Sequence, residues 1–351
     1  MIVLEIDGSR YSGSGTIVRQ AVGLAALTGR GIHVVNARIK RPKPGLRRQH
    51  AQAVEAIRQL VDGTTEGAIL GSREFIFRPG KPQAIPHYVW DIGSAGSTTA
   101  LALAVLPVLA FAPAPVTIEL HGGLFQDFAP SFYHIEHVLL PLLIRMGFTL
   151  SIRMERPGYV PTGQGIWHLS AIPVTNRLQP LVLDRAGAVK KIWGIALSSR
   201  LKERSVSDRM AETAKHVFRA AGYDADVQVL YDDKARQAGA CLAAFADLSD
   251  GARIGSDRAG AQRRSSEAIG QYVASQLLED LRTGATLDRY ASDQIIPFAA
   301  LAAGESRFRL PRVTEHIDSN AWLSREFLGA KIYIEQHELV VQGVGFEARA
   351  K

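Results

Sequence analysis

Six basic side chains lie within eleven residues of this 351-residue chain, and no acidic residue is among them. They are Arg38, Lys40, Arg41, Lys43, Arg47 and Arg48. A guanidinium group binds two phosphate oxygens at once, and a dense run of cations suits a polyphosphate or a nucleic-acid backbone. The prolines and the glycine of residues 42–45 predict a loop ahead of a helix, where ligand-binding side chains are common. This placement favours anion binding over the alternative, a solvated basic face.

Two glycine-rich loops, at residues 8–15 and 93–97, each follow an apolar run and precede a helical pattern. The free N–H groups at the start of a helix can bind an anion. The first loop lacks the third glycine of the dinucleotide-binding pattern, where Val18 stands, and the chain has no G-x-x-x-x-G-K-[ST] phosphate loop. The loops therefore indicate a phosphate site without identifying the ligand, and tight turns alone are the alternative.

Composition narrows the class of protein. Ten bases against three acids in residues 1–60 account for the whole net charge of +7. Cys241 is the single cysteine, which excludes an internal disulfide or a thiolate metal cluster and favours a reducing compartment. The first residues lack the features of a signal peptide. Residues 92–118 carry no charge, but prolines leave an apolar stretch of about a dozen residues, below the ~20 that a membrane span needs. We expect a cytoplasmic protein with no membrane segment.

One order of elements recurs along the chain. Residues 2–77 predict strand, helix, strand, helix, strand, strand, and residues 88–170 predict the same order again. A third copy begins at residues 181–184, is interrupted by about a hundred residues, and resumes at Leu287. The predicted strands are 2–6, 32–37, 66–70, 74–77, 88–92, 116–120, 149–154, 165–170, 181–184, 193–198, 225–230, 241–247, 307–310, 331–336 and 339–343. The predicted helices are 16–27, 47–61, 98–111, 131–146, 206–221, 287–302 and one from about residue 316.

These elements predict an α/β (α+β) fold. Repeated units that cannot bury their own apolar faces must pack together into one body. We therefore expect three repeated βαβαββ units to form one large catalytic domain from residues 1–184 and 284–351. A small α/β domain, residues 185–283, would be inserted in the third unit.

Short motifs give the chain a resemblance to the RNA 3′-terminal phosphate cyclase family over nearly its whole length. In order they are Asp7-Gly8 through Gly13-x-Gly15-x-Ile17-x-Arg19, Arg38-x-x-Arg41-x-x-Pro44-Gly45-Leu46-x-x-Gln49-His50, Phe77-x-Pro79-Gly80, Ile92-Gly93-Ser94-Ala95-Gly96-Ser97, Gly122-Gly123, Ala129-Pro130, Tyr290-x-x-Asp293-Gln294 and His316-x-x-Ser319-Asn320. The family fold has three βαβαββ units and an inserted domain, in agreement with the pattern above.

The resemblance implies an ATP-dependent enzyme of the ligase type that acts on RNA 3′-phosphate ends. His316 would displace pyrophosphate from ATP and form an adenylyl-histidine. AMP would then pass to the RNA 3′-phosphate, and the ribose 2′-hydroxyl would close a 2′,3′-cyclic phosphate. A neutral imidazole is nucleophilic near pH 7, so this role suits a histidine. Asp293 is expected to orient the imidazole and Asn320 to hold its loop.

The resemblance also implies the binding residues. The expected ATP contacts are Arg19, Arg38, Arg41, Gln49, Leu103, Tyr290, Ala291, Ser292, Asp293 and Gln294, with Tyr290 against the base. The RNA phosphate is expected to contact Arg38, Arg41 and Lys43. For each residue the alternative is structural: solvated arginines, and an ordinary helix start at Tyr290.

The positions that depart from the family pattern include two near the expected nucleotide. Ser12 stands where the family has a glutamate that binds metal, and Leu103 stands where it has a glutamine near the nucleotide. A divalent cation, Mg²⁺ or Mn²⁺, is expected with ATP, but the sequence does not identify the residue that would bind it. Two other readings are also open: a non-catalytic RNA-binding or ribosome-assembly relative, and an enolpyruvyl-type transferase, which would leave the His316 motif unexplained.

Overall fold

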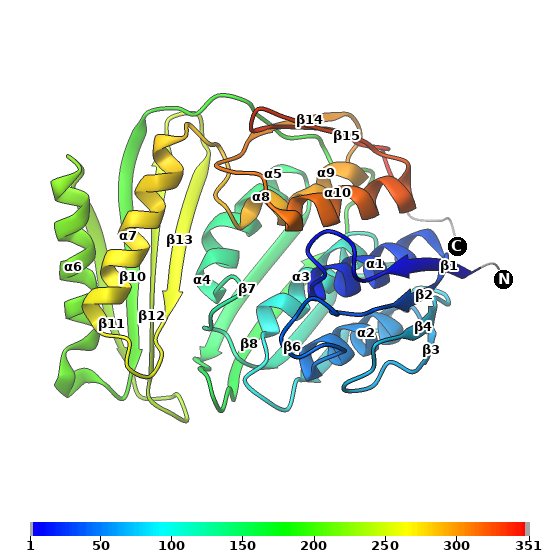
Figure 1. The fold of residues 1–351 in the computed structure, drawn as a ribbon, viewed down its shortest axis with the longest axis horizontal. Helices are drawn as coiled ribbons and strands as arrows, with labels where there is room; N and C mark the ends of the chain where they lie inside the picture. The colour runs from blue at the N-terminus through cyan, green and yellow to red at the C-terminus, as the bar shows by residue number, and fades with distance from the viewer. Residues whose placement is uncertain (1–2, 348–351) are drawn as a thin grey trace.

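The computed structural model describes residues 3–347 and is mixed α/β, as the sequence predicts. Within these residues the strands form four sheets of four strands each. Figure 1 shows one sheet with its helices at the left and the other elements gathered at the right. No helix of the described residues is long and apolar enough to cross a membrane.

Three of the sheets share one strand order, in which the first two strands are parallel and the others antiparallel. The first sheet is β1 (Val3–Asp7), β2 (Gly31–Val35), β4 (Phe75–Arg78) and β3 (Thr64–Glu66). The second is β5 (His87–Asp91), β6 (Val116–Gly122), β8 (Gly165–Ile172) and β7 (Thr149–Arg156). The third is β9 (Val182–Leu183), β14 (Glu305–Arg309), β16 (Glu338–Gln342) and β15 (Lys331–Glu335). These three sheets therefore have the same topology.

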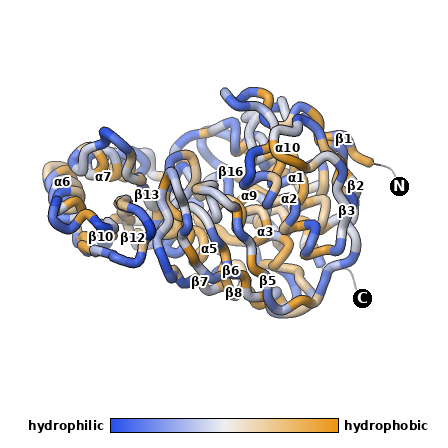
Figure 2. The backbone as a smooth tube through the Cα atoms, turned by 90° about the horizontal axis from the view of Figure 1, so that it is seen from below, coloured by the Kyte–Doolittle hydropathy of each residue, from blue (hydrophilic) through white to orange (hydrophobic). Residues whose placement is uncertain are grey.

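Helices fill the space between these sheets. They are α1 (Gly15–Thr28), α2 (Arg48–Leu60), α3 (Thr98–Leu109), α4 (Phe132–His134), the π-helical turn η1 (Ile135–Leu139), α5 (Leu140–Arg145), α8 (Ala291–Gln294), α9 (Ile296–Leu301) and α10 (Glu315–Leu328). Helix α1 packs against α2, α3 and α10. Figure 2 shows the hydrophobic parts of α1, α2 and α3 in the middle of this part of the molecule. Strands such as β8 alternate buried and less buried residues, so one face meets the helices and the other faces outward.

The fourth sheet comes from the segment predicted as an insertion. Its strands are β11 (Ala225–Asp232), β10 (Val189–Ser199), β12 (Gly239–Leu248) and β13 (Arg253–Ala259), in that order. The 3₁₀ turn η2 (Lys202–Arg204) precedes α6 (Val206–Ala220), and α7 (Ser266–Arg282) follows the last strand. Both helices pack on the sheet around a core that includes Met210, Phe218 and Leu242. Cys241 and Phe245 on the opposite face join the main core, so the sheet is buried on both sides.

Some predicted elements are wrong in detail. The helix predicted at 287–302 is divided into α8 and α9, because Pro297 lacks the N–H that would continue the first helix. The strand predicted at 66–70 is instead β3, which ends at Glu66 before Gly67, whose φ is +74°. The sequence prediction also lacked β13 and α7. The limits of the two domains, at 184/185 and 283/284, stay predictions.

Trp167 connects the second sheet to the start of α3. The side chain is fully buried, and its Nε1 donates to Thr98 Oγ1 at 2.8 Å, which in turn donates to the Gly123 carbonyl at 2.8 Å. We expect Trp167→Phe to lower the free energy of unfolding by about 2 kcal/mol, because packing volume and a buried donor are lost together. The measurement is urea denaturation followed by circular dichroism.

The matched control is Tyr333→Phe on the outer face of the third sheet, where 55% of the side chain is exposed. Its unfolding free energy should change by less than about 0.5 kcal/mol. Equal values for the two variants would show that the Trp167 contacts do not contribute to stability.

Candidate active site

The starts of two helices far apart in the sequence meet around His316. This residue lies in the first turn of α10, whose N-cap Thr314 accepts from the Ile317 N–H. The Nδ1 atom of His316 is 3.0 Å from Oγ1 of Thr16, in the first turn of α1. One helical turn further along α10, Ser319 Oγ lies 2.8 Å from Ser12 Oγ. These contacts fix the imidazole against the first glycine-rich loop.

The His316 imidazole is neutral over the ordinary pH range. Burial lowers its pKa to about 4, and the positive charges of Arg19 and Arg41 act in the same direction. Thr16 Oγ1 also accepts from Nη2 of Arg19 at 3.3 Å. In the tautomer that carries its proton on Nδ1 and donates it to Thr16 Oγ1, the lone pair of the ring lies on Nε2. His316 can therefore act as a nucleophile through Nε2.

The arginines around this ring form a positively charged cluster with little neutralising charge. Burial lowers the pKa of Arg19 to about 10, the Asp293 carboxylate opposes that shift, and Arg38 and Arg41 add to it. Within residues 3–347, no hydrogen bond or ion pair engages the Arg41 guanidinium. Like charges held together without counter-charges favour the binding of an anion, and phosphate oxygens fit the guanidinium geometry.

Arg38 and Lys43 were both expected to contact the RNA phosphate, but in the structure the Arg38 guanidinium also binds the backbone of its own loop. Arg38 has a φ of +57°, and its Nη1 donates to the carbonyl oxygens of Lys43 at 2.8 Å and Gly45 at 2.6 Å. Its guanidinium therefore holds the loop before α2, in addition to the charge that it adds beside Arg41. Lys43 is exposed, and its backbone takes part in this contact.

Gln49 and His50 close the base of the site. Gln49 Oε1 accepts from the Ser97 N–H at 2.8 Å, so the amide binds the second glycine-rich loop. His50 is buried, its Nδ1 accepts from the Arg47 N–H at 3.1 Å, and burial together with the Arg19 charge holds its pKa well below the usual range. A Cβ on Gly15 would lie 2.0 Å from His50 Nε2, so only glycine fits there.

Asp293 and Asn320 lie next to each other, as the motifs suggest, but not in the predicted contact with the imidazole. Asn320 Nδ2 donates to the Asp293 carbonyl at 2.7 Å. Burial raises the pKa of Asp293 to about 7, against the opposing effect of Arg19. Within the described chain, Thr16 occupies the position of hydrogen-bond partner to His316 that we expected for Asp293. Oδ1 of Asn320 and Oε1 of Gln294 are buried without a partner in residues 3–347.

The segment from Tyr290 to Gln294 is held by a buried carboxylate that the prediction missed. Asp288 accepts from the N–H groups of Tyr290 at 2.9 Å and Ala291 at 2.8 Å, while Ser292 Oγ donates to the Asp288 carbonyl at 2.6 Å. The same carboxylate accepts from the Gly255 N–H of β13 at 2.9 Å. An aspartate just before a helical segment is a sequence signal for a helix start, because its carboxylate can accept from the first free N–H groups. The role of Asp288 could therefore have been predicted.

His134 of α4 also contacts the Asp288 carboxylate, and no sequence signal pointed to this histidine. Its Nε2 lies 3.0 Å from Asp288, and neither side chain is exposed. The Asp288 charge raises the pKa of His134 against the effect of burial, and His134 in turn lowers the pKa of Asp288. The Tyr290 ring meets the His134 ring edge-on at 5.5 Å. The predicted nucleotide-binding segment is therefore joined to both α4 and β13.

Ser12 stands at the position where a metal ligand was expected, and its hydroxyl has other partners. The Ser12 hydroxyl is engaged by Ser14 Oγ at 3.1 Å and by Ser319 Oγ at 2.8 Å. Within residues 3–347 no group of three or more His, Cys, Asp or Glu side chains is arranged to hold a metal ion. Leu103 is buried on α3, and its side chain has no polar atom to offer a nucleotide.

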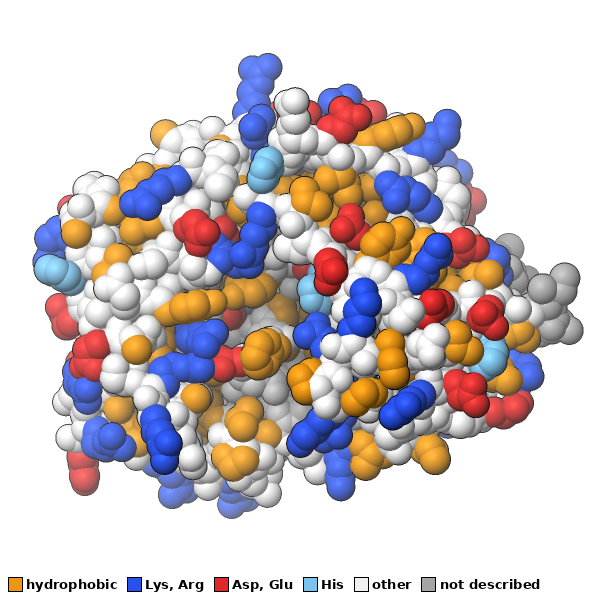
Figure 3. Space-filling model, viewed as in Figure 1, with side chains coloured by type: hydrophobic (Ala, Val, Ile, Leu, Met, Phe, Trp, Pro, Cys, Tyr) orange, Lys and Arg blue, Asp and Glu red, His pale blue; other side chains and the backbone are white. Residues whose placement is uncertain are grey.

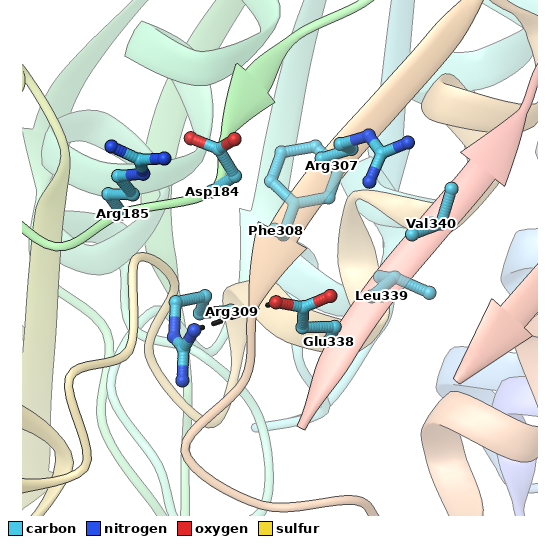
Figure 4. Close-up of a pocket in the computed structure, with 8 residues that line it drawn as sticks. All are labelled: Asp184, Arg185, Arg307, Phe308, Arg309, Glu338, Leu339 and Val340. Atoms are coloured by element: carbon cyan, nitrogen blue, oxygen red, sulfur yellow. Dashed lines mark ion pairs between the residues drawn. The ribbon is translucent and has the colours of Figure 1, made fainter. Parts of the chain in front are cut away.

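A separate pocket of ≈ 190 Å³ lies between β9, β14 and β16 (Figure 4). Its lining residues are Asp184, Arg185, Arg307, Phe308, Arg309, Glu338, Leu339 and Val340, none of which is a predicted site residue. Arg309 lies 3.5 Å from Glu338, and Arg307 is 2.7 Å from Glu305, so these arginines are neutralised. Figure 3 shows a different hollow in the middle of one face, with basic side chains and a histidine near its rim.

His316, which is partly buried, and His134, which is fully buried, should titrate on opposite sides of the usual value of about 6.5. We expect a midpoint of about 4 for His316 and one above 6.5 for His134. The stabilising contribution of neutral His316 is complete above pH 6.5 and is lost as the pH falls towards 4. That of protonated His134 is complete below pH 6.5 and is lost as the pH rises through its folded pKa. The measurement is histidine NMR, with resonances assigned from His316→Gln and His134→Asn. A His316 midpoint near 6.5 would contradict the partly buried, arginine-flanked environment.

Known proteins match this chain over nearly its whole length. The sequence pattern of the RNA 3′-terminal phosphate cyclase family matches residues 10–334. The chain is 36% identical to a Methanopyrus kandleri protein named RNA 3′-terminal phosphate cyclase, over 96% of this chain and 97% of that protein. Proteins of the same name from Hyperthermus butylicus and Methylococcus capsulatus are each 36% identical, over 98% and 96% of this chain and 99% and 94% of their own. The chain therefore belongs to the RNA 3′-terminal phosphate cyclase family.

Proposed function

We propose that this protein converts an RNA 3′-terminal phosphate to a 2′,3′-cyclic phosphate at the expense of ATP. The observation that carries the proposal is the His316 ring, which is neutral, held through Nδ1 by Thr16 and flanked by the charges of Arg19 and Arg41. Membership of the family and the names of its relatives support the same reaction. The enzyme would be of the ligase type, because it transfers a nucleotidyl group before the new bond is closed.

In the first step Nε2 of His316 attacks the α-phosphorus of ATP. A P–N bond forms, the bond to the bridging oxygen breaks, and pyrophosphate leaves. Thr16 Oγ1 continues to accept the Nδ1 proton of the positively charged adenylyl-imidazole. Arg19 and Arg41 offset the charge that develops on the phosphate oxygens. The start of α10 adds partial positive charge from its free N–H groups.

In the second step an oxygen of the RNA 3′-phosphate attacks the adenylyl phosphorus, and the P–N bond breaks. The ribose 2′-hydroxyl then loses its proton and attacks the 3′-phosphorus, so that AMP leaves and the cyclic phosphate closes. Arg41 and Arg38 are the proposed contacts for the RNA phosphate, with Lys43 at the edge of the same loop. Asp293 contributes by position, because it balances the Arg19 charge and its carbonyl holds Asn320.

The nucleotide is proposed to lie along the Tyr290–Gln294 segment. Tyr290 offers its ring to the base, and the backbone of Ala291 and Ser292 is fixed by Asp288. The unpartnered oxygens of Asn320 and Gln294 are acceptors for donors such as a base amino group or a ribose hydroxyl. Gln49 and Leu103 shape the adjoining wall.

The divalent cation, Mg²⁺ or Mn²⁺, is proposed to arrive on the ATP phosphates, because the Ser12 hydroxyl is engaged by two other serines. That same observation favours the second candidate, a non-catalytic RNA-binding relative, since a carboxylate is a much better Mg²⁺ ligand than a hydroxyl. The cytoplasmic location and the division into three repeats with an insertion are retained as proposals.

Transfer of label from α-³²P-ATP distinguishes the two candidates. With Mg²⁺ or Mn²⁺ present, we expect a label on the protein that is acid-labile and alkali-stable, as a P–N bond is, and that is absent in His316→Ala. The control is His216→Ala on α6, where the side chain is exposed and labelling should be unchanged. A folded wild-type protein that takes up no label would favour the non-catalytic candidate.

Alanine variants of Arg41 and Arg38 should distinguish an effect on RNA binding from an effect on the stability of the fold. Arg41→Ala should raise the KM for RNA 3′-phosphate ends at least about tenfold, because a charge-assisted phosphate contact is lost, and leave the unfolding free energy unchanged. Arg38→Ala should also lower stability by about 1 kcal/mol, because two carbonyl groups lose their donor. Steady-state kinetics and urea denaturation give the two readouts. Equal losses of stability in both variants would show that Arg41 has a structural role as well.

A further inference from the structure

The loop between β6 and α4 holds one fully exposed aromatic ring. Phe128 has a relative exposure of 104%, and its φ of +68° lies in the left-handed region that non-glycine residues avoid. A phenylalanine in that conformation is strained, and a ring in water contributes nothing to the core. The chain therefore accepts two unfavourable features at one position without a compensating contact inside the molecule.

The rest of this loop is firmly held. Phe125 is buried and stacks on Tyr159 at 5.5 Å, and the Pro130 carbonyl accepts from Thr99 Oγ1 at 2.7 Å. With its amide oriented to satisfy its neighbours, Gln126 donates to the Ala95 carbonyl at 2.8 Å and accepts from Ser97. Phe128 is thus presented from a rigid support, so little ordering entropy would be lost when a ligand packs on it.

An ion-pair clamp fixes the tip of the loop to the fourth sheet. The Asp127 carboxylate accepts two bonds from Arg264, at 3.0 and 2.8 Å, and lies 3.4 Å from Nε of Arg258. Beside the clamp, Arg263 is exposed, and within residues 3–347 its guanidinium has no hydrogen bond or ion pair. Three arginines against one carboxylate leave this surface positively charged around the Phe128 ring.

The loop also borders the candidate active site at both ends. Gln126 contacts Ser97, whose N–H is bound by Gln49 at 2.8 Å. On the other side, Arg258 lies over the Tyr272 ring at 4.5 Å, and Tyr272 is close enough to Tyr290 of the proposed nucleotide segment to help raise the pKa of its hydroxyl. The loop is therefore joined by short chains of contacts to both the Gln49 side chain and the Tyr290 segment.

We infer that Phe128 is a stacking platform for a base of the RNA upstream of its 3′-terminal nucleotide, with Arg263 binding a neighbouring phosphate. This inference rests on the proposed function. Single-stranded RNA is bound by aromatic rings beside cationic side chains, and stacking tolerates any base because every base has a flat face. One ring among arginines is too small for a protein interface or a membrane patch, which need a wider apolar surface.

The test compares wild type with Phe128→Asn, since asparagine tolerates a positive φ. With a 3′-phosphorylated ten-nucleotide RNA, we expect Phe128→Asn to raise KM about tenfold, and Phe128→Tyr to restore it. With a nucleoside 3′-monophosphate, which has no upstream base, the variants should match wild type. The unfolding midpoint of Phe128→Asn should not fall, since backbone strain is relieved. Tyr333→Ala, an exposed aromatic of the third sheet, is the matched control.

Adenylylation of His316 by ATP alone separates this inference from the proposed function. Unchanged labelling of Phe128→Asn supports an RNA site, whereas weaker ATP binding would place the ring in the nucleotide pocket and overturn the inference. If wild-type protein takes up no label, the proposed function fails, and fluorescence anisotropy of a 3′-phosphorylated RNA still measures the Phe128 contribution. Equal RNA binding by wild type and Phe128→Asn would also overturn the inference. So would a wild-type dimer that is lost in Phe128→Asn, because the ring would then belong to a protein interface.

Discussion

The hydrogen bond between Thr16 and His316 is the contact on which the candidate active site depends. It joins the first turn of α1 to the first turn of α10, so a residue near the beginning of the chain holds the imidazole of one near its end. Ser12 and Ser319 reinforce the same junction with a second buried contact. Because helix starts carry free N–H groups and partial positive charge, their meeting point suits a phosphate before any arginine is considered.

The arginines make that junction selective for anions. Arg19, Arg38 and Arg41 act on one another and on His50 and His316, and the structure offers them little opposing charge beyond Asp293. Their combined effect keeps both imidazoles neutral, which preserves the nucleophilic lone pair of His316. An incoming triphosphate or RNA phosphate supplies the missing negative charge, so ligand binding relieves an electrostatic cost already present in the folded protein.

The Asp288 carboxylate has a comparable role for the proposed nucleotide segment. It collects donors from His134, Gly255 and the start of α8, which belong to three parts of the chain. A buried carboxylate with that many donors is well satisfied, whereas removal of His134 would leave an unpaired charge in the core. The fourth sheet therefore helps to position the segment that follows Asp288, and the Asp127 clamp binds the same sheet to the loop that carries Phe128.

The sequence alone was sufficient for the α/β class, the order of most elements and the family, because these depend on local periodicity and on motif spacing. It also indicated the arginines and His316. Local patterns failed where packing overrides them. Strand β13 buries Ser256 and Asp257, so it lacks a simple apolar alternation. Helix α7 was also missed, although the spacing of Ile269, Val273 and Leu277 did indicate a helix.

Only the tertiary structure decided which side chains meet. Thr16 rather than Asp293 is the partner of His316, Ser12 is bound by other serines, and Arg38 is partly used to hold its own loop. These contacts join residues up to 307 positions apart, or depend on one backbone conformation. Hydrogen bonds act over about 3 Å, so they follow from the final packing of the helices and not from spacing along the chain.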